Sequence, residues 1–171
     1  MLVAIAATTT HGARMSSKST ATPENALTQE EIDTRLGSTA RAHLASFRSD
    51  GMIHLTPIWF DWDGSVFRLS LGAGRVHLKN LAANPRVTIL VDEDPRLQHG
   101  LAAGAWAIEC RGIAELSNDE TLIEEVTHRA LVKALGEADA EQYTKPLMAE
   151  GRTIVTITPE TWHTWDYNKV D

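Results

Sequence analysis

The chain has 171 residues, of which 43% are hydrophobic, and this is enough for one domain with a sizeable core. Its 16 basic and 23 acidic residues leave a net charge of -7, which argues against a general nucleic-acid binder because such proteins need a dominant positive field. The single cysteine, Cys110, excludes an intrachain disulfide. We expect it to fill the core as a small hydrophobic residue, in a protein of the reducing cytoplasm.

The first 25 residues differ in composition from the rest of the chain. Residues 1–7 are apolar but too few to span a bilayer, and they lack the leading basic residues of a secretory signal, so neither export nor membrane insertion is expected. Residues 8–25 are rich in Ser, Thr and Ala without apolar periodicity, so burial cannot offset their ordering entropy. The sequence therefore predicts a flexible extension over residues 1–25, in which Met15 is an alternative start to Met1, and a folded domain over residues 26–171.

The first half of the predicted domain begins with a helix and continues with strands. Thr28 and Glu31 have the spacing of a capping box, which predicts a short helix as far as Gly37. Hydrophobic alternation then predicts three strands, over residues 40–47, 53–60 and 65–71. Asp-Gly pairs at positions 50–51 and 63–64 are typical of tight hairpins, so the three strands are expected to be antiparallel neighbours in a meander.

A basic block over residues 74–85 follows, and it is the most informative segment for function. Arg75, His77 and Lys79 stand at the expected start of a short helix, just after Gly72 and Gly74, where the helix dipole also favours an anion. A phosphate-bearing ligand is one interpretation. The other is that these residues form a solvated helix face. A buried strand over residues 86–92 comes directly after the block.

The second half of the domain is expected to contain long strands and two helices. A strand is predicted over residues 103–116, and a capping-box pattern from Ser117 to Glu120 starts a helix that ends at Gly136. A second helix over residues 138–150 is expected to be interrupted by Pro146, and two final strands, 153–158 and 161–167, to be separated by Pro159. Six or seven antiparallel strands with few helices favour a mainly β protein with a closed or nearly closed barrel.

These elements carry a family resemblance. The resemblance rests on three features in this order: a hairpin, the motif Arg-x-His-x-Lys-Asn-Leu-x-x-Asn-Pro, and the strand Val-Thr-Ile-Leu-Val-Asp. In these features the chain resembles the pyridoxamine 5'-phosphate oxidase-like, FMN-binding split-barrel superfamily, and within it the flavin- and deazaflavin-dependent oxidoreductases. The resemblance spans residues 30–167 in element order. The similarity extends to a sequence motif only over residues 74–92, and residues 111–116 and 161–165 support it. It implies a six- or seven-stranded antiparallel split β-barrel with flanking helices.

The resemblance also implies a cofactor and a set of residues that bind it. Family members hold FMN or the deazaflavin coenzyme F-420 between the two subunits of a homodimer, and the phosphate contacts of the family correspond to Arg75, His77 and Lys79. The position of His77 is a lysine in much of the family. The strand that passes the cofactor ring corresponds to Thr56, Pro57, Ile58 and Trp59, and the next strand reaches the cofactor through Ser70 and Leu71.

Several aromatic side chains have two possible roles in the predicted barrel. Ile58 and Trp59 would contact the ring or form ordinary barrel core, and Trp106, Trp162 and Trp165 would either close the pocket of the partner subunit or fill core and interface.

Other chemistries find little support in the sequence. The seven histidines show no HExxH or paired ligand spacing, and the acidic run over residues 92–94 is expected to be a solvated loop, so no metal site is predicted. A nucleophile elbow is absent too, and we assign no catalytic residue. The resemblance thus implies a cofactor-dependent oxidoreductase that acts on a small organic substrate. The alternative is a non-enzymatic carrier of flavin, deazaflavin or haem. Pyridoxamine 5'-phosphate oxidase itself ranks lower, because there is no second basic cluster for a substrate phosphate.

Overall fold

The computed structural model describes residues 24–94 and 104–169. Most of the predicted extension, including Met1 and Met15, therefore lies outside the described residues. Four α-helices, seven strands and one 3-10 helix follow one another in the described part of the chain: α1 (Gln29–Ser38), β1 (Arg41–Phe47), β2 (Ile53–Trp59), β3 (Asp61–Trp62), β4 (Phe67–Gly72), α2 (Val76–Ala83), β5 (Arg86–Glu93), β6 (Trp106–Ser117), α4 (Glu120–Leu135), α5 (Glu137–Ala149), β7 (Arg152–Asp166) and η1 (Tyr167–Lys169).

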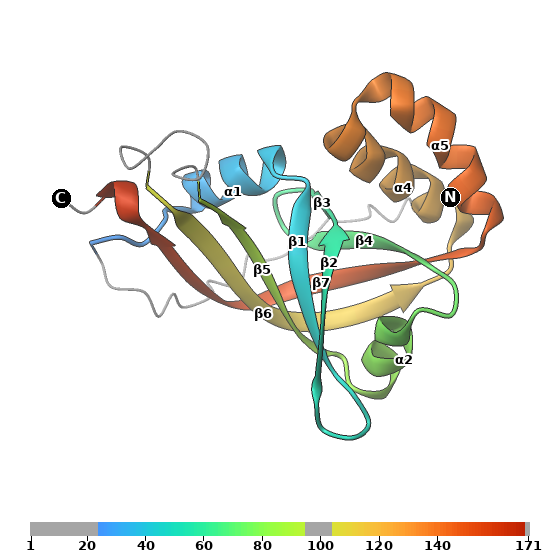
Figure 1. Ribbon diagram of the computed structural model, residues 1–171, viewed down its shortest axis with the longest axis horizontal. Coiled ribbons are helices and arrows are strands. Elements are labelled where there is room, and N and C mark those ends of the chain that lie inside the picture. The colour runs from blue at the N-terminus through green and yellow to red at the C-terminus, as the bar shows by residue number, and fades with distance from the viewer. Residues whose placement is uncertain (1–23, 95–103, 170–171) are drawn as a thin grey trace, which may run out of the picture.

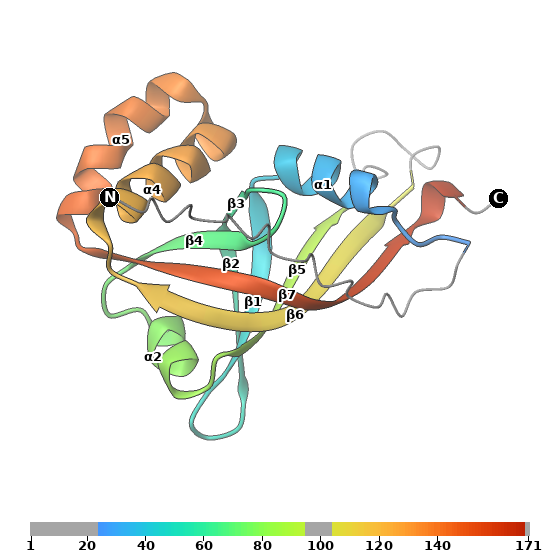
Figure 2. The ribbon, with the colours of Figure 1, turned by 180° about the vertical axis from the view of Figure 1, so that it is seen from behind.

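The described strands form one antiparallel sheet in the order β2-β1-β5-β6-β7-β4-β3. The sheet is strongly curved, and β2 near one end of the order contacts β4 near the other without hydrogen-bonded pairing. Both views show α1, α4 and α5 along one side of the sheet and α2 near the opposite side (Figures 1 and 2). This confirms the predicted mainly β split barrel of six or seven strands with flanking helices, and the described residues form seven strands. The split lies between β2 and β4.

The hairpin turns form as predicted, but one expected strand pairing is wrong. Gly51 and Gly64 adopt positive φ angles of 83° and 88°, which favour glycine, and they turn the chain between β1 and β2 and between β3 and β4. The short strand β3 was not predicted. Strand β4 pairs with β3 and β7 and not with β2, so the three-stranded meander does not form. Alternation shows which face of β4 is buried, but it carries no information about the partner.

The two predicted C-terminal strands are one continuous strand, β7. Its pairing with β6 shifts register between Arg111 and Gly112, which face Thr161 and Pro159, so Glu160 is the extra residue of a β-bulge. Pro159 is tolerated at this bulge and does not end the strand. The close approach requires glycine on the other strand, since a Cβ on Gly112 would lie 2.3 Å from the carbonyl oxygen of Thr158.

The helices differ from the prediction in two respects, the N-cap of α4 and the effect of Pro146 on α5. Helix α1 has the predicted capping box, in which Thr28 and Glu31 bond reciprocally. The cap of α4 is Asp119 and not Ser117, which still belongs to β6. Pro146 lies near the end of α5, where it removes one hydrogen bond without interrupting the helix. None of the helices in the described part of the chain is long and apolar enough to cross a membrane.

One main core fills the curve of the sheet. Helices α1 and α2 contribute Leu36 and Leu81 to the same cluster as the sheet residues. Trp106 and Trp162 are 5% and 7% exposed and belong to this core, which confirms the core alternative for both. Cys110 is fully buried as predicted, and burial raises the pKa of its thiol well above the ordinary value.

Candidate functional site

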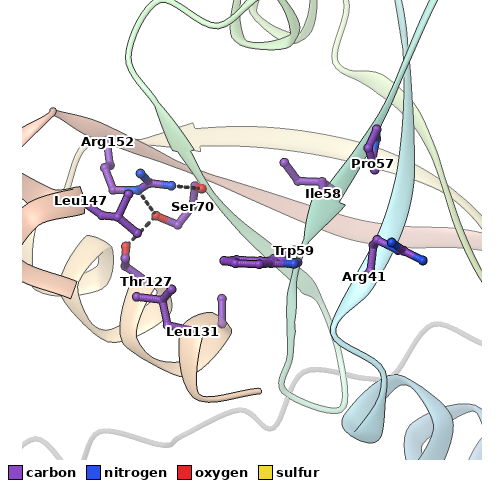
Figure 3. Close-up of a pocket in the computed structure, with 10 residues that line it drawn as sticks. Arg41, Pro57, Ile58, Trp59, Ser70, Thr127, Leu131, Leu147 and Arg152 are labelled. Atoms are coloured by element: carbon purple, nitrogen blue, oxygen red, sulfur yellow. Dashed lines mark hydrogen bonds between the residues drawn. The ribbon is translucent and has the colours of Figure 1, made fainter. Parts of the chain in front are cut away.

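A cavity of about 400 Å³ opens at the split in the barrel. Its size lies within the range of small-molecule sites. The edge strand β2 forms one wall, and β4, α4, α5 and the start of β7 form the other, as Figure 3 shows. The lining residues are Arg41, Pro57, Ile58, Trp59, Ser70, Thr127, Ala130, Leu131, Leu147 and Arg152.

The β2 wall is apolar. The Trp59 side chain is 42% exposed although its indole is large and hydrophobic, and Pro57 and Ile58 lie beside it along the strand. β2 pairs with β1 on one edge only, so its other edge offers backbone N–H and C=O groups that bond to no further strand of the described sheet. This wall can therefore take a planar ring and bond to its polar edge.

The opposite wall holds an organised polar group. The guanidinium of Arg152 donates from Nε to the Ser70 hydroxyl over 2.6 Å and from a terminal nitrogen to the Ser70 carbonyl oxygen. The Ser70 and Thr127 hydroxyls lie 2.6 Å apart. Burial lowers the pKa of Arg152, the charge of Arg75 lowers it further, and Glu150 offsets part of the effect. An arginine stays charged under these conditions, so an anion in the cavity would relieve the unfavourable burial.

Arg75 lies near Arg152 but is not among the residues that line the cavity. It is the N-cap residue of α2, and its side chain makes no capping hydrogen bond. A Cβ on Gly72 would lie 3.7 Å from the Arg75 Nε, and Gly72 is the cross-strand partner of Arg152. Within the described residues, Arg75 has no carboxylate partner. Two guanidinium groups and a helix N-terminus therefore meet beside the polar wall.

The other two basic residues of the block point elsewhere. His77 is buried at 7% exposure against His54, with 6.0 Å between ring centroids, and its Nε2 has no hydrogen-bond partner. Burial lowers the pKa of His77, and the charges of His54 and Arg75 act in the same direction. Lys79 is exposed. His77 lies two residues from both Arg75 and Lys79, about 200° away around the helix, which explains why it is buried while the other two are exposed.

The remaining predicted residues divide between cavity and core. Pro57, Ile58, Trp59 and Ser70 line the cavity. Leu71, at 2% exposure, belongs to the core, and Thr56, Trp165, His77 and Lys79 do not line the cavity. Sequence reasoning missed Arg41, Thr127 and Arg152. No local motif marks Arg152, because it lies 82 residues from Ser70 and only the β4–β7 pairing brings the two together.

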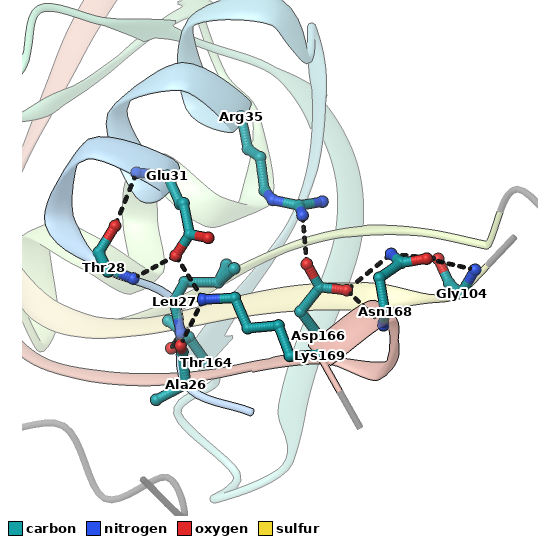
Figure 4. Close-up of polar contacts among 10 residues, drawn as sticks. All are labelled: Ala26, Leu27, Thr28, Glu31, Arg35, Gly104, Thr164, Asp166, Asn168 and Lys169. Atoms are coloured by element: carbon teal, nitrogen blue, oxygen red, sulfur yellow. Dashed lines mark hydrogen bonds and ion pairs between the residues drawn. The ribbon is translucent and has the colours of Figure 1, made fainter. Parts of the chain in front are cut away.

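A second polar group occupies the opposite end of β7, and its charges are satisfied within the chain (Figure 4). Asp166, which is 3% exposed, forms an ion pair with Arg35 and accepts hydrogen bonds from Asn168. The Arg35 guanidinium also stacks on Trp106, at 4.6 Å from the ring centroid. Lys169 pairs with Glu31 at 2.5 Å. This group ties α1 to the end of β7 and leaves no charge available to a ligand.

Comparison with known proteins supplies the family. The model of the pyridoxamine 5'-phosphate oxidase family matches residues 28–166, which is most of the chain. The chain belongs to this family. The match includes both walls of the cavity and the basic block. A search of curated proteins finds no significant match.

Solved structures share the fold. A conserved hypothetical protein from Mycobacterium tuberculosis is 22% identical with a TM-score of 0.76, over 90% of this chain and 92% of that one. An F420 reductase is 25% identical with a TM-score of 0.54, over 76% and 94% of the two chains. The haem storage protein HutZ from Vibrio cholerae is 19% identical with a TM-score of 0.58, over 77% and 89%. The fold is therefore shared by proteins described in terms of different cofactors.

Proposed function

We propose that this protein is an oxidoreductase that binds FMN or the deazaflavin coenzyme F-420 in the cavity between β2 and β4 and acts on a small organic substrate. The observation that carries the proposal is the pairing of an apolar wall, centred on Trp59, with a cationic end at which Arg152 lines the cavity and Arg75 adds its charge from nearby. A ring that ends in a phosphate needs both features. The family match and the similarity to an F420 reductase support the same cofactor class.

Each wall has a separate task in this proposal. Trp59 stacks against the ring, Ile58 adds an apolar contact from the core side, and the free edge of β2 hydrogen-bonds its polar rim. Arg152 and Arg75 bind the phosphate as charge-assisted donors. The bound cofactor supplies the hydride chemistry, whereas the chain orients it and excludes water. We assign no catalytic residue.

The proposal includes a homodimer that completes the cavity. Large apolar side chains are exposed on the β1–β2 hairpin, and those of Ile53, Leu55 and Trp59 are 52%, 63% and 42% exposed. They alternate along β2 on the same face as Pro57, which lines the cavity. A second copy on this face would bury these side chains and cover the open side of the ring. Sedimentation of the wild-type protein and of Leu55→Glu tests this, with a dimer expected only for the wild type.

Haem carriage is the alternative that the fold leaves open, but the cavity does not favour it. Haem iron in proteins is held by His, Cys, Met or Tyr side chains. None of the ten lining residues is of these types. The donors that the cavity offers are guanidinium groups and hydroxyls, which suit a phosphate and a polar ring edge.

Calorimetric titration of the apo-protein with FMN, coenzyme F-420 and haemin tests the proposed function. We expect tight binding of FMN or F-420 and weak binding of haemin. Reduction of a conjugated acceptor by the loaded protein would then establish the enzymatic role. Tight binding of haemin alone would overturn the proposal in favour of a carrier.

A further inference from the structure

We propose that Arg41 forms an anion-binding subsite at the far end of the cavity, so that the molecule lying over Trp59 carries a carboxylate or a similar anionic group. This inference rests on the proposed function, because it concerns the same cavity. It specifies the chemical class of the ligand, which carries an anionic group.

The charge of the cavity is the first observation. The chain has seven more acidic than basic residues, yet two arginines and no aspartate or glutamate are among the ten lining residues. Figure 3 shows Arg152 and Arg41 on opposite sides of Trp59. Two cationic ends separated by an apolar wall are complementary to anionic groups at both ends of the space that a flat ligand would fill.

The two arginines differ in what already holds them. Arg152 is fixed by hydrogen bonds to Ser70, and Arg75 lies beside it, so this end has the donors for the phosphate of a cofactor. Within the described residues, the Arg41 side chain makes neither a hydrogen bond nor an ion pair. The carboxylate of Asp92 at the end of β5 contacts His43 instead, at 3.5 Å. Arg41 is therefore available to a ligand.

The position of Arg41 follows from strand register. Arg41 and Trp59 are direct partners in the antiparallel β1–β2 pair, so their side chains emerge side by side from the same face. The Arg41 guanidinium does not stack on the Trp59 ring, since the cation–ring contacts of the described residues are those of Arg35 and Lys133. A molecule stacked on the indole can thus place an anionic group against this guanidinium, and a carboxylate would be bound by two parallel hydrogen bonds.

A matched pair of probes tests the subsite. Cinnamate and cinnamamide are flat conjugated molecules that differ in one charged group, and both are titrated by calorimetry into wild-type protein with and without cofactor. We expect the wild type to bind cinnamate about fivefold more tightly, because Arg41 is exposed and its charge is partly screened. The Arg41→Gln variant is expected to lose this preference, and Arg41→Lys to keep part of it. Arg48→Gln removes an exposed arginine of the same hairpin and serves as the control.

The same variants show where the anionic group resides. Loss of the cinnamate preference assigns it to the substrate, whereas weaker binding of FMN or F-420 by Arg41→Gln assigns it to the cofactor. The subsite is disproved if Arg41→Gln changes neither, or if Arg48→Gln has the same effect. Failure of the wild type to bind either cofactor would overturn the proposed function alone, since the titration without cofactor still reports on Arg41.

Discussion

The polar groups at the two ends of β7 differ in whether their charges are paired within the chain. At the C-terminal end, Asp166 is buried but paired with Arg35 and bonded to Asn168. At the N-terminal end, Arg152 is half-buried and bonded to the neutral Ser70, and the neighbouring Arg75 is a second cation. A group whose charges are balanced stabilises the fold, whereas one with excess charge of a single sign is suited to an external partner of the opposite sign. This difference distinguishes the internally paired end of the strand from the end that we propose binds the cofactor.

The largest expected effect is at the balanced end. Asp166→Asn leaves the Arg35 guanidinium without its anion, and we expect the free energy of unfolding to fall by about 3 kcal/mol, the lower part of the range for a broken buried pair. Urea denaturation measures it. Asp50→Asn, which removes the partner of an exposed arginine, is the control and should change stability far less. Equal effects of the two substitutions would contradict the structural role of Asp166.

The unbalanced end should respond in binding more than in stability. Arg152→Gln removes the charged donor beside Ser70, and we expect the Kd for the cofactor to rise by about 10- to 100-fold, as charged hydrogen bonds contribute about 1.5 to 3 kcal/mol. Calorimetry on the purified variant gives the value. Arg111→Gln changes an exposed arginine outside the cavity and should leave the Kd unchanged. An unaltered Kd in Arg152→Gln would remove this residue from the site.

A smaller loss is expected at the apolar wall. Trp59→Ala removes an indole that is 42% exposed, so the fold loses little, but the cofactor ring loses its stacking surface. We expect weaker cofactor binding by about 1 kcal/mol, and near wild-type binding in Trp59→Phe, which keeps a flat ring. If Trp59→Phe is as weak as Trp59→Ala, the indole contributes something other than a stacking surface.

The smallest effect concerns His77 and the pH dependence of stability. Its pKa is lowered by burial in the folded protein, so below the ordinary value of about 6.5 the unfolded chain binds more protons at this residue. The contribution of His77 to stability is complete above that pH and is lost as the pH falls towards the folded-state pKa. Urea midpoints at pH 7.5 and 5.5 should therefore differ less in His77→Gln than in the wild type. An equal difference would show that His77 is not held neutral against His54.

Local chemistry in the sequence predicted the elements well. The capping box of Thr28 and Glu31 and the helix end at Gly136 are encoded within a few residues, and alternation located most strands. Strand pairing was harder to predict, because the alternating pattern of β4 is compatible with several partner strands. In the structure β4 pairs with β7. The continuous strand across Pro159 depends on a bulge opposite Gly112, which no local pattern indicates.

The candidate site was also predictable only in part. The apolar wall of Pro57, Ile58 and Trp59 lies on one strand, so the resemblance could indicate it as a unit. The basic block was less informative than it looked, because helical periodicity directs His77 into the protein and Lys79 away from it. Arg152 joins Ser70 only through tertiary pairing, which is why a single sequence could not reveal it.

A crystal structure of the protein with its bound cofactor tests the central claim most directly. We expect the ring against Trp59 in the split between β2 and β4, with the phosphate in contact with Arg152. A ring bound in a different cavity, lined by Phe47 and Ile53, or a phosphate without contact to Arg152 or Arg75, would contradict this claim.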